Sequence, residues 1–269
     1  MSDYFQKIRD QVMWDRLIAL VEEQARTMMR VAFSTVVREA GDLSAGVFNA
    51  KGEMLAQAVT GTPGHVNSMA RSVMHFLAAI PPETMKPGDS YITNDPWKGT
   101  GHLFDLTVFT PAFHKGKLVA FFASTAHVAD IGGNGPSPDS RDVFSEGLFI
   151  PLSPLCIAGE MNKLLLDIMR ANSREPDKLE GDVYALVACN EAGCSRLGKM
   201  MDEYGLDDIT ALSDHILTST DRSMKEAIAK LPKGKWTNTM RIDGFDEPVD
   251  FVATLTIDEE NIHVDFTGS

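Results

Sequence analysis

The sequence predicts an α+β protein in which helices pack on antiparallel β-sheets. Residues 5–28 and 162–230 space their apolar side chains three and four positions apart, as one face of a helix requires, whereas residues 236–266 alternate as strands do. The chain has 269 residues, of which 43% are hydrophobic. This composition fits one large globular domain or two modest ones, and it excludes a disordered or fibrous chain.

Residues 1–85 are expected to form a helix, a β-hairpin and a second helix. The apolar face of the first helix consists of Phe5, Ile8, Val12, Leu17, Leu20, Val21, Ala25 and Met28. Gly41 ends this helix at the latest, because glycine is a poor residue for a helix interior. The runs Leu43–Phe48 and Met54–Val59 then face each other across a turn that contains Gly52, a residue that tolerates positive φ.

A β-rich region, residues 86–154, follows the second helix, whose apolar pattern covers residues 66–77 and stops before Pro81. The expected strands of this region are Ser90–Thr93, Leu106–Pro111 and Lys117–Ala126. Its loops are rich in glycine at residues 99–101 and 132–136. We expect these loops to lie open to solvent, where functional sites are usually built.

Residues 155–232 are expected to be helical, with a break at Pro176 and a new start near Asp207. Residues 233–269 are expected to form a β-meander. Its strands are Trp236–Ile242, Val249–Ile257 and Asn261–Phe266. Because the sequence stops directly after a strand, we expect the open strand edge to pair with a neighbouring polypeptide.

The charge of the chain disfavours nucleic acids and membrane surfaces as partners. Lys and Arg number 25 against 38 Asp and Glu, a net charge of −13 that repels phosphate groups. The three cysteines form no Cys-x-x-Cys pair, no secretory signal opens the chain, and no apolar run is long enough for a membrane helix. We therefore expect a soluble, cytoplasmic protein.

The densest group of functional side chains lies in residues 94–105, and a second short group follows at residues 127–130. His102 and Asp105 flank a turn that enters one strand, and His127 ends the next antiparallel strand, so the three side chains should meet at one end of the sheet. Two imidazoles and a carboxylate are a credible ligand set for a catalytic divalent metal, with coordination positions left open for water or substrate.

The same three residues also allow a purely structural interpretation. His102 would then be a hydrogen-bonded loop histidine, Asp105 a residue that caps the start of a strand, and His127 a partly buried strand residue. Because His-x-x-Asp is a short and common pattern, spacing alone leaves both interpretations open.

Four sequence blocks in order resemble the hydantoinase B family. They are Asn-Asp-Pro-Trp (94–97), Gly-Thr-Gly-His-Leu-Phe-Asp (99–105), Ala-His-Val-Ala-Asp-Ile-Gly-Gly (126–133) and Glu-Gly-Leu-Phe-Ile-Pro (146–151). The similarity extends to residues 38–42, 181–182 and 264–269. This family includes the B half of N-methylhydantoinase and 5-oxoprolinase, and the metal-bearing subunits of acetone and acetophenone carboxylases. The resemblance implies a hydantoinase B-like fold.

The resemblance also implies a metal site and partner subunits. The family's metal ligands fall on His102, Asp105 and His127, and zinc, manganese and iron all suit such ligands. A separate hydantoinase A-type subunit would hold ATP, in keeping with the lack of a phosphate-binding loop motif in this chain. The family usually has proline where Phe104 stands, and it continues past residue 269. We therefore expect residues 233–269 to end at a break in the family domain, with another polypeptide supplying its C-terminal half.

Four further residues are candidates for catalytic roles. Asp95 and Asp130 could accept hydrogen bonds from the imidazoles and fix their tautomers, although both are also ordinary turn residues. Glu39 and His65 could form a proton-transfer pair, or be a helix-end charge and a helix-start histidine. Glu146 lies in the fourth of the sequence blocks, and its carboxylate is expected to pair with Arg141.

The sequence thus predicts the metal-bearing subunit, or a fragment of it, of an ATP-dependent hydantoinase or oxoprolinase-type hydrolase that opens a cyclic amide. Two alternatives stay open. The first is the metal subunit of an ATP-dependent ketone carboxylase, and the second is a noncatalytic scaffold with the same fold.

Overall fold

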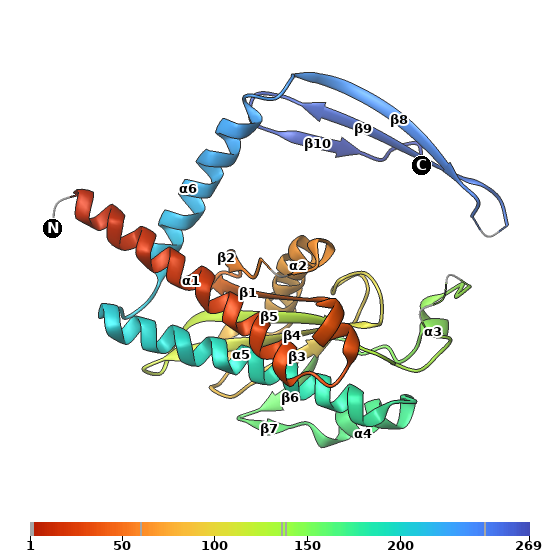
Figure 1. The fold of residues 1–269 in the computed structure, drawn as a ribbon, viewed down its shortest axis with the longest axis horizontal. Helices are drawn as coiled ribbons and strands as arrows, with labels where there is room; N and C mark the ends of the chain where they lie inside the picture. Colours follow the sequence, from red (N-terminus) through yellow and green to blue (C-terminus); the bar gives the residue numbers. More distant parts are fainter. Residues whose placement is uncertain (1–2, 60, 136, 138, 245) are drawn as a thin grey trace. The chain divides into compact units, whose positions relative to one another are not determined.

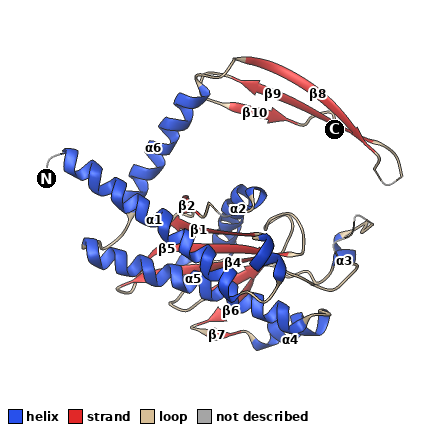
Figure 2. Cartoon of the chain, viewed as in Figure 1, coloured by secondary structure: helices blue, strands red, loops and turns tan. Residues whose placement is uncertain are grey.

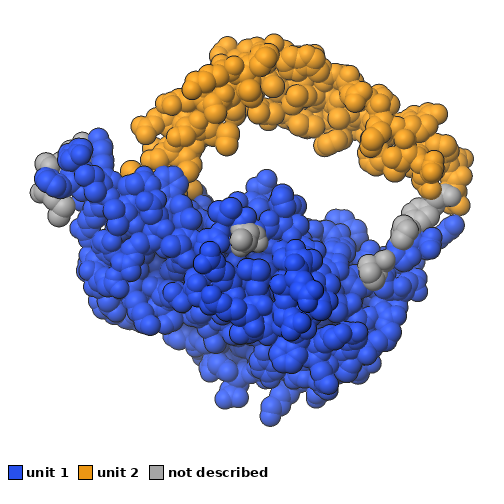
Figure 3. All heavy atoms as spheres, in the orientation of Figure 1, with its two compact units in different colours: residues 1–213 blue, residues 214–269 orange. Residues whose placement is uncertain are grey.

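The computed structural model describes residues 3–59, 61–135, 137, 139–244 and 246–269 of the chain. These residues form two compact units, Met1–Ser213 and Asp214–Ser269 (Figure 3). None of the helices in these ranges is long and apolar enough to cross a membrane. The expected glycine loop at residues 132–136 includes Pro136, which lies outside the described residues.

The first unit is built on a seven-stranded antiparallel sheet with the strand order β2-β1-β5-β4-β3-β6-β7 (Figure 1). The strands are β1 (Leu43–Asn49), β2 (Met54–Gln57), β3 (Ser90–Thr93), β4 (Asp105–His114), β5 (Lys117–His127), β6 (Ser153–Ile157) and β7 (Glu160–Met161). The hairpin β4–β5 turns at Lys115 and Gly116, both with positive φ of 49° and 79°. This left-handed turn suits the twist of the two strands it joins.

Helices cover both faces of this sheet (Figure 1). On one face α1 (Asp3–Val31), α4 (Lys163–Asn172) and α5 (Pro176–Tyr204) share one apolar core with the strands. On the other face α2 (Pro63–Ala79) forms a second core. The short elements are η1 (Val36–Ala40, a π-helical turn), η2 (Pro82–Thr84, a 3₁₀ turn) and α3 (Val143–Glu146).

Strand alternation decides which side chains face α2. In β4, Leu106 and Val108 join the core under α1 and α5, whereas Phe109 joins the core under α2. The Phe109 ring stacks on Phe76 of α2 with ring centroids 5.1 Å apart. Asp105 has the same parity as Phe109, so its side chain lies on the α2 face at the end of the strand.

The second unit consists of most of α6 (Thr210–Ile228) and a three-stranded antiparallel sheet with the order β10-β9-β8 (Figure 2). Its strands are β8 (Gly234–Ile242), β9 (Val249–Ile257) and β10 (Ile262–Asp265). The expected β-meander is therefore present, within a residue or two at each strand end.

The α+β fold class predicted from the sequence is confirmed, with differences in the loops. The short elements η1, η2, α3, β6 and β7 were not expected. The glycine loops are open to solvent only in part, because Gly101, Gly133 and Asn134 are exposed whereas Gly99 and Gly135 are buried. At Gly132, with a φ of 85°, an added Cβ would lie 2.4 Å from the carbonyl oxygen of Asn172. Glycine here permits close packing of the loop on the backbone of α4.

Candidate functional site

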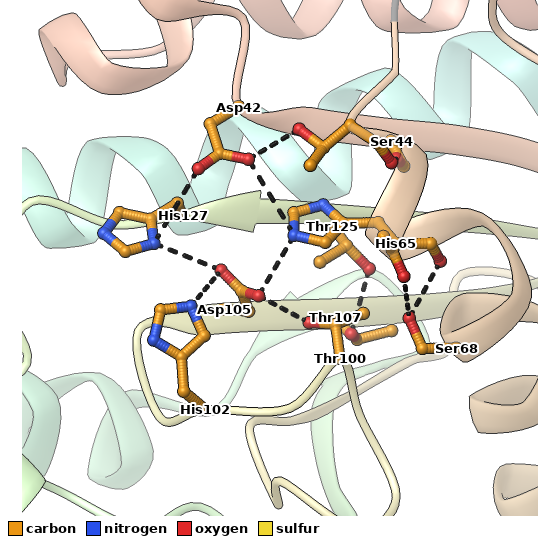
Figure 4. Close-up of polar contacts among 12 residues, drawn as sticks. Asp42, Ser44, His65, Ser68, Thr100, His102, Asp105, Thr107, Thr125 and His127 are labelled. Atoms are coloured by element: carbon orange, nitrogen blue, oxygen red, sulfur yellow. Dashed lines mark hydrogen bonds and ion pairs between the residues drawn. The ribbon is translucent and has the colours of Figure 1, made fainter. Parts of the chain in front are cut away.

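Three strand ends bring the candidate site together on the α2 face of the sheet (Figure 4). The β4–β5 register pairs Asp105 with His127. The β1–β5 register pairs Leu43 with Ala126, and the N–H of His127 donates to the carbonyl oxygen of Asp42 at 3.1 Å. His102 lies in the loop that enters β4, three residues before Asp105. Antiparallel pairing therefore places all four side chains at the same end of neighbouring strands.

The carboxylate of Asp105 is the centre of the site. Its Oδ1 lies 3.0 Å from Nε2 of His102 and 3.2 Å from Nδ1 of His127. Its Oδ2 lies 3.1 Å from Nε2 of His65 and accepts a hydrogen bond from the Thr100 hydroxyl at 2.8 Å. The carboxylate is buried, with a relative exposure of 2%, and each of these close neighbours is a nitrogen or a hydroxyl.

A second carboxylate, Asp42, lies beside the first and was not among the candidates from the sequence. Its Oδ1 accepts a hydrogen bond from the Thr62 hydroxyl at 2.6 Å and lies 3.8 Å from Nε2 of His65. Its Oδ2 lies 4.0 Å from Nδ1 of His127 (Figure 4). The signal that could have found Asp42 is its position directly before the first strand of the hairpin, behind the left-handed Gly41.

The ring of Phe104 supports the imidazoles from one side. It stacks on His127 with ring centroids 5.4 Å apart and an interplanar angle of 15°, and it lies 5.9 Å from the His102 ring. The His102 and His127 rings are themselves 5.0 Å apart. Phe104 is fully buried, so its ring restricts how the two imidazole rings can move. The family usually has proline at this position.

The imidazoles control the charge of Asp105. Burial alone would raise the pKa of this carboxyl, but hydrogen bonds from His102, His127 and His65 outweigh burial and hold the pKa well below its usual range. The hydrogen bond to Asp105 in turn raises the pKa of His102, against the opposing effect of its partial burial. The site therefore holds an ionised carboxylate at neutral pH.

The geometry of His102, Asp105 and His127 fits a divalent metal. One ligand atom of each residue lies within 4.8 Å of the others. The separations of 3.0 and 3.2 Å from Asp105 Oδ1 to the two imidazole nitrogens match neighbouring ligands around an ion with bonds of about 2.1 Å. Two nitrogens and one oxygen suit zinc, manganese or iron, and Asp42 could add a further oxygen. The His102 side chain is 38% exposed, so solvent reaches the site on that side.

Asn94 fixes the loop that carries His102. Its fully buried amide Nδ2 donates to the carbonyl oxygens of Leu103 and Leu148 at 2.8 and 2.9 Å. Its Oδ1 accepts the N–H of Ile150 at 2.6 Å. Glu146 accepts the N–H of Leu103 at 3.1 Å, so the sequence block at 146–151 holds the ligand loop in place. These contacts give Asn94 and Glu146 a positioning role.

The structure gives Asp95 and Asp130 partners other than imidazoles. The Asp95 carboxylate accepts the N–H of Trp97 at 3.0 Å and lies 3.2 Å from Nζ of Lys98. Asp130 is bound by the guanidinium of Arg174 through both Nε and an Nη, and by the Ser173 hydroxyl at 3.0 Å. These contacts differ from the expected role as imidazole acceptors, because other groups already hold each carboxylate.

The structure also separates the expected proton-transfer pair. His65, on the first turn of α2, joins the site through Asp105. Glu39 is exposed, and its carboxylate lies 4.0 Å from the guanidinium of Arg38. Asp42, three residues further along, is the acidic residue of this segment that lies near His65, because the chain turns at Gly41, directly after the π-helical turn η1, and enters β1.

Comparisons with known proteins give one family match and several relatives. The family model described as Hydantoinase B/oxoprolinase matches residues 6–269. The chain is 28% identical to the B-type component of a putative D-/L-hydantoinase of Pseudomonas sp. (strain NS671), over 96% of this chain and 46% of that protein. It is 29% identical to the β component of the caprolactamase of Pseudomonas jessenii, over 81% of this chain and 38% of that protein. The chain spans about half the length, or less, of these curated relatives.

Two solved structures share the fold. The ATP-dependent caprolactamase from Pseudomonas jessenii matches with a TM-score of 0.86 and 26% identity, over 96% of this chain and 45% of that chain. An acetone carboxylase in its nucleotide-free form matches with a TM-score of 0.86 over 98% of this chain and 37% of that chain. At 19% identity, the second match is evidence for the fold alone.

Proposed function

The chain belongs to the hydantoinase B/oxoprolinase family, and from this premise we propose that it supplies the metal site of an ATP-dependent enzyme that opens a cyclic amide. The observation that carries the proposal is the buried carboxylate of Asp105, whose Oδ1 lies 3.0 Å from a nitrogen of His102 and 3.2 Å from a nitrogen of His127. Relatives named as a hydantoinase, a 5-oxoprolinase and a caprolactamase support the choice of a cyclic amide as substrate.

His102, Asp105 and His127 would hold a divalent zinc, manganese or iron ion, with Asp42 in reach as a further oxygen donor. Such an ion, when bound, lowers the pKa of a bound water and stabilises an oxyanion. The buried Asp105 fits this role because, among the described residues, histidines and a hydroxyl rather than a lysine or arginine surround its carboxylate.

The other residues of the site hold these donors in place. His65 and Thr100 bind Oδ2 of Asp105 and so leave Oδ1 directed at the two imidazoles. Phe104 restricts the His127 ring from one side. The exposed side of His102 leaves a path by which substrate and water can approach. Binding and orientation are therefore separate tasks of separate side chains.

ATP would be bound by a hydantoinase A-type partner. An unstrained lactam or imide carbonyl is a poor electrophile, and phosphorylation of its oxygen by ATP converts that oxygen into part of a leaving group. This phosphoryl transfer releases ADP. One water then adds to the carbonyl carbon, and the ring C–N bond breaks to give the free amine and an acyl phosphate. A second water hydrolyses the acyl phosphate to the carboxylate and inorganic phosphate. The active enzyme is therefore expected to contain at least two kinds of subunit.

The alternative is an ATP-dependent ketone carboxylase, in which the same site would stabilise an enolate that attacks carbon dioxide. The match to an acetone carboxylase is at the level of the fold, so it does not favour this alternative over the hydrolase. A noncatalytic scaffold is the third candidate, and the convergence of two imidazoles on a buried carboxylate argues against it.

The test is ATP turnover by the purified complex with hydantoins, 5-oxoproline, lactams or simple ketones, each with and without bicarbonate. We expect ATP consumption and ring opening with a cyclic amide, independent of bicarbonate and lost in His127→Ala. His75→Ala, a half-buried change on α2 outside the site, is the matched control. Product that requires both a ketone and bicarbonate would overturn the hydrolase assignment, and equal activity of His127→Ala would favour the scaffold.

A further inference from the structure

The sheet of the second unit has one apolar and one polar face. The β8–β9 register pairs Met240 with Phe251, and the β9–β10 register pairs Leu255 with Val264, so these side chains point to the same side. With Asn238 as the exception, the residues on this face of the three strands are apolar. They are Trp236, Met240, Ile242, Val249, Phe251, Ala253, Leu255, Ile257, Ile262 and Val264.

The opposite face is completed by its own polar contacts. The hydroxyls of Thr237 and Thr254 lie 3.0 Å apart across β8 and β9. Arg241 binds the carboxylate of Asp250 through two hydrogen bonds of 2.6 Å. Polar pairs of this kind can remain exposed to water, so this is the face that the sheet presents to solvent.

The apolar face is uncovered within its own unit. Phe251 is 41% exposed, Val264 47% and Met240 59%. Among the described residues of this unit α6 is the only helix, and Figure 2 shows it meeting the sheet at one end. A sheet with one hydrophobic face must bury that face against another layer to form a stable domain.

The size of this face indicates a partner layer rather than scattered surface residues. The two long strands have nine residues each. At about 3.3 Å per residue and about 4.8 Å between strands, the apolar face covers roughly 300–400 Å². This extent is comparable to the largest apolar patch on a typical soluble monomer, and such a patch often has a function.

We propose that the apolar face of β8, β9 and β10 is the docking face for the second half of the hydantoinase B domain. This inference rests on the family membership and on the proposed function, in which the second half of the domain is present in the active enzyme. The curated relative from Pseudomonas sp. and the solved caprolactamase chain each contain about as much polypeptide again as they share with this chain. The family model matches residues 6–269, so the family domain includes this sheet, and the additional polypeptide of the relatives is a candidate cover for it.

The chemistry of the face defines the docking element. It must present an apolar surface without charged side chains, because a charge buried there would find no partner across the interface. A second copy of this chain is the less favourable occupant, since each copy has a net charge of −13. The docking element is thus an amphipathic layer of the second half of the domain.

The experiment uses the full chain together with the second half of the domain from the same source, either co-expressed or as one polypeptide. The photo-reactive residue p-benzoylphenylalanine replaces Phe251 on the apolar face or, as the control, the exposed Thr239 on the polar face of the same sheet. After irradiation, mass spectrometry maps the cross-linked peptides. We expect cross-links from position 251 to the second half of the domain at about ten times the yield from position 239.

A second variant tests the same face without cross-linking. Phe251→Ser combined with Val264→Thr should weaken association with the second half by about 100-fold, whereas Thr239→Ser leaves it unchanged. Cross-links from position 251 to residues 1–213 or to a second copy, equal yields from both positions, or no cross-link would overturn the proposal. Metal content is measured on the same samples, so that the docking proposal and the proposed function are tested separately. A metal-free complex that still cross-links would refute the proposed metal site but not the docking face.

Discussion

Asn94 is the residue whose loss should best reveal how the ligand loop is held. It makes three buried hydrogen bonds, to the carbonyl oxygens of Leu103 and Leu148 and to the N–H of Ile150. Asn94→Ala removes all three and leaves the backbone groups in a dry environment. At about 1 kcal/mol for each bond, the free energy of unfolding of the first unit should fall by about 3 kcal/mol.

The assay is thermal and urea unfolding, with the exposed Asn134→Ala of a neighbouring loop as the matched control. A loss of this size corresponds to a fall in Tm of about 6–12 °C for a unit of this length, whereas the control should change Tm very little. Metal affinity should fall as well, because Leu103 lies between His102 and Asp105. If Asn94→Ala and Asn134→Ala unfold alike, the inference that Asn94 organises this loop is wrong.

The remaining predictions concern the groups around the site. His65→Ala should lower metal affinity by about 10–100-fold without abolishing binding, and His65→Gln, which keeps a donor for Asp105, should lose less, as measured by metal titration. Phe104→Leu should keep the fold but weaken metal binding by about tenfold, because the aromatic support of His127 is lost, and a normal affinity would show that the stacking is incidental. Asp130→Asn should reduce the free energy of unfolding at pH 7. Burial acts to raise the pKa of Asp130, but the bonds from Arg174 outweigh it and lower the pKa, so this stabilisation is present above the carboxyl's ordinary pKa and is lost as the pH falls through its lowered value. Urea unfolding of wild type and Asp130→Asn should therefore converge in acid, and a difference that persists there would contradict the assignment.

The sequence could predict the part of the site that depends on adjacent strands. His102, Asp105 and His127 lie on one hairpin and its entry loop, so antiparallel pairing alone places them at one end of the sheet. Asp42 directly precedes β1, whose pairing with β5 joins segments far apart in the sequence. No local pattern indicates that register, and the contribution of Asp42 therefore became clear only from the fold.

The distinction between local contacts and contacts from distant segments also explains why the surroundings of Asp130 and Glu39 differ from those expected. Asp130 follows His127 closely in sequence, but Arg174, just before α5, binds it from a distant segment. Glu39 and Asp42 are both acidic residues before β1, but Glu39 lies within the π-helical turn η1 and Asp42 follows it, and this turn has no clear sequence signal. By contrast, the alternation in β8 and β9 directly gives the apolar and polar faces of that sheet, because strand side chains have a period of two.

The most direct test of the proposed metal site is the metal content of the purified complex, measured by elemental analysis for wild type and single variants. We expect about one zinc, manganese or iron ion per chain, a loss of this metal in His102→Ala and in His127→Ala, and no loss in the control His75→Ala. Metal content that is unchanged in both His102→Ala and His127→Ala would contradict the assignment of the site and, with it, the proposed function.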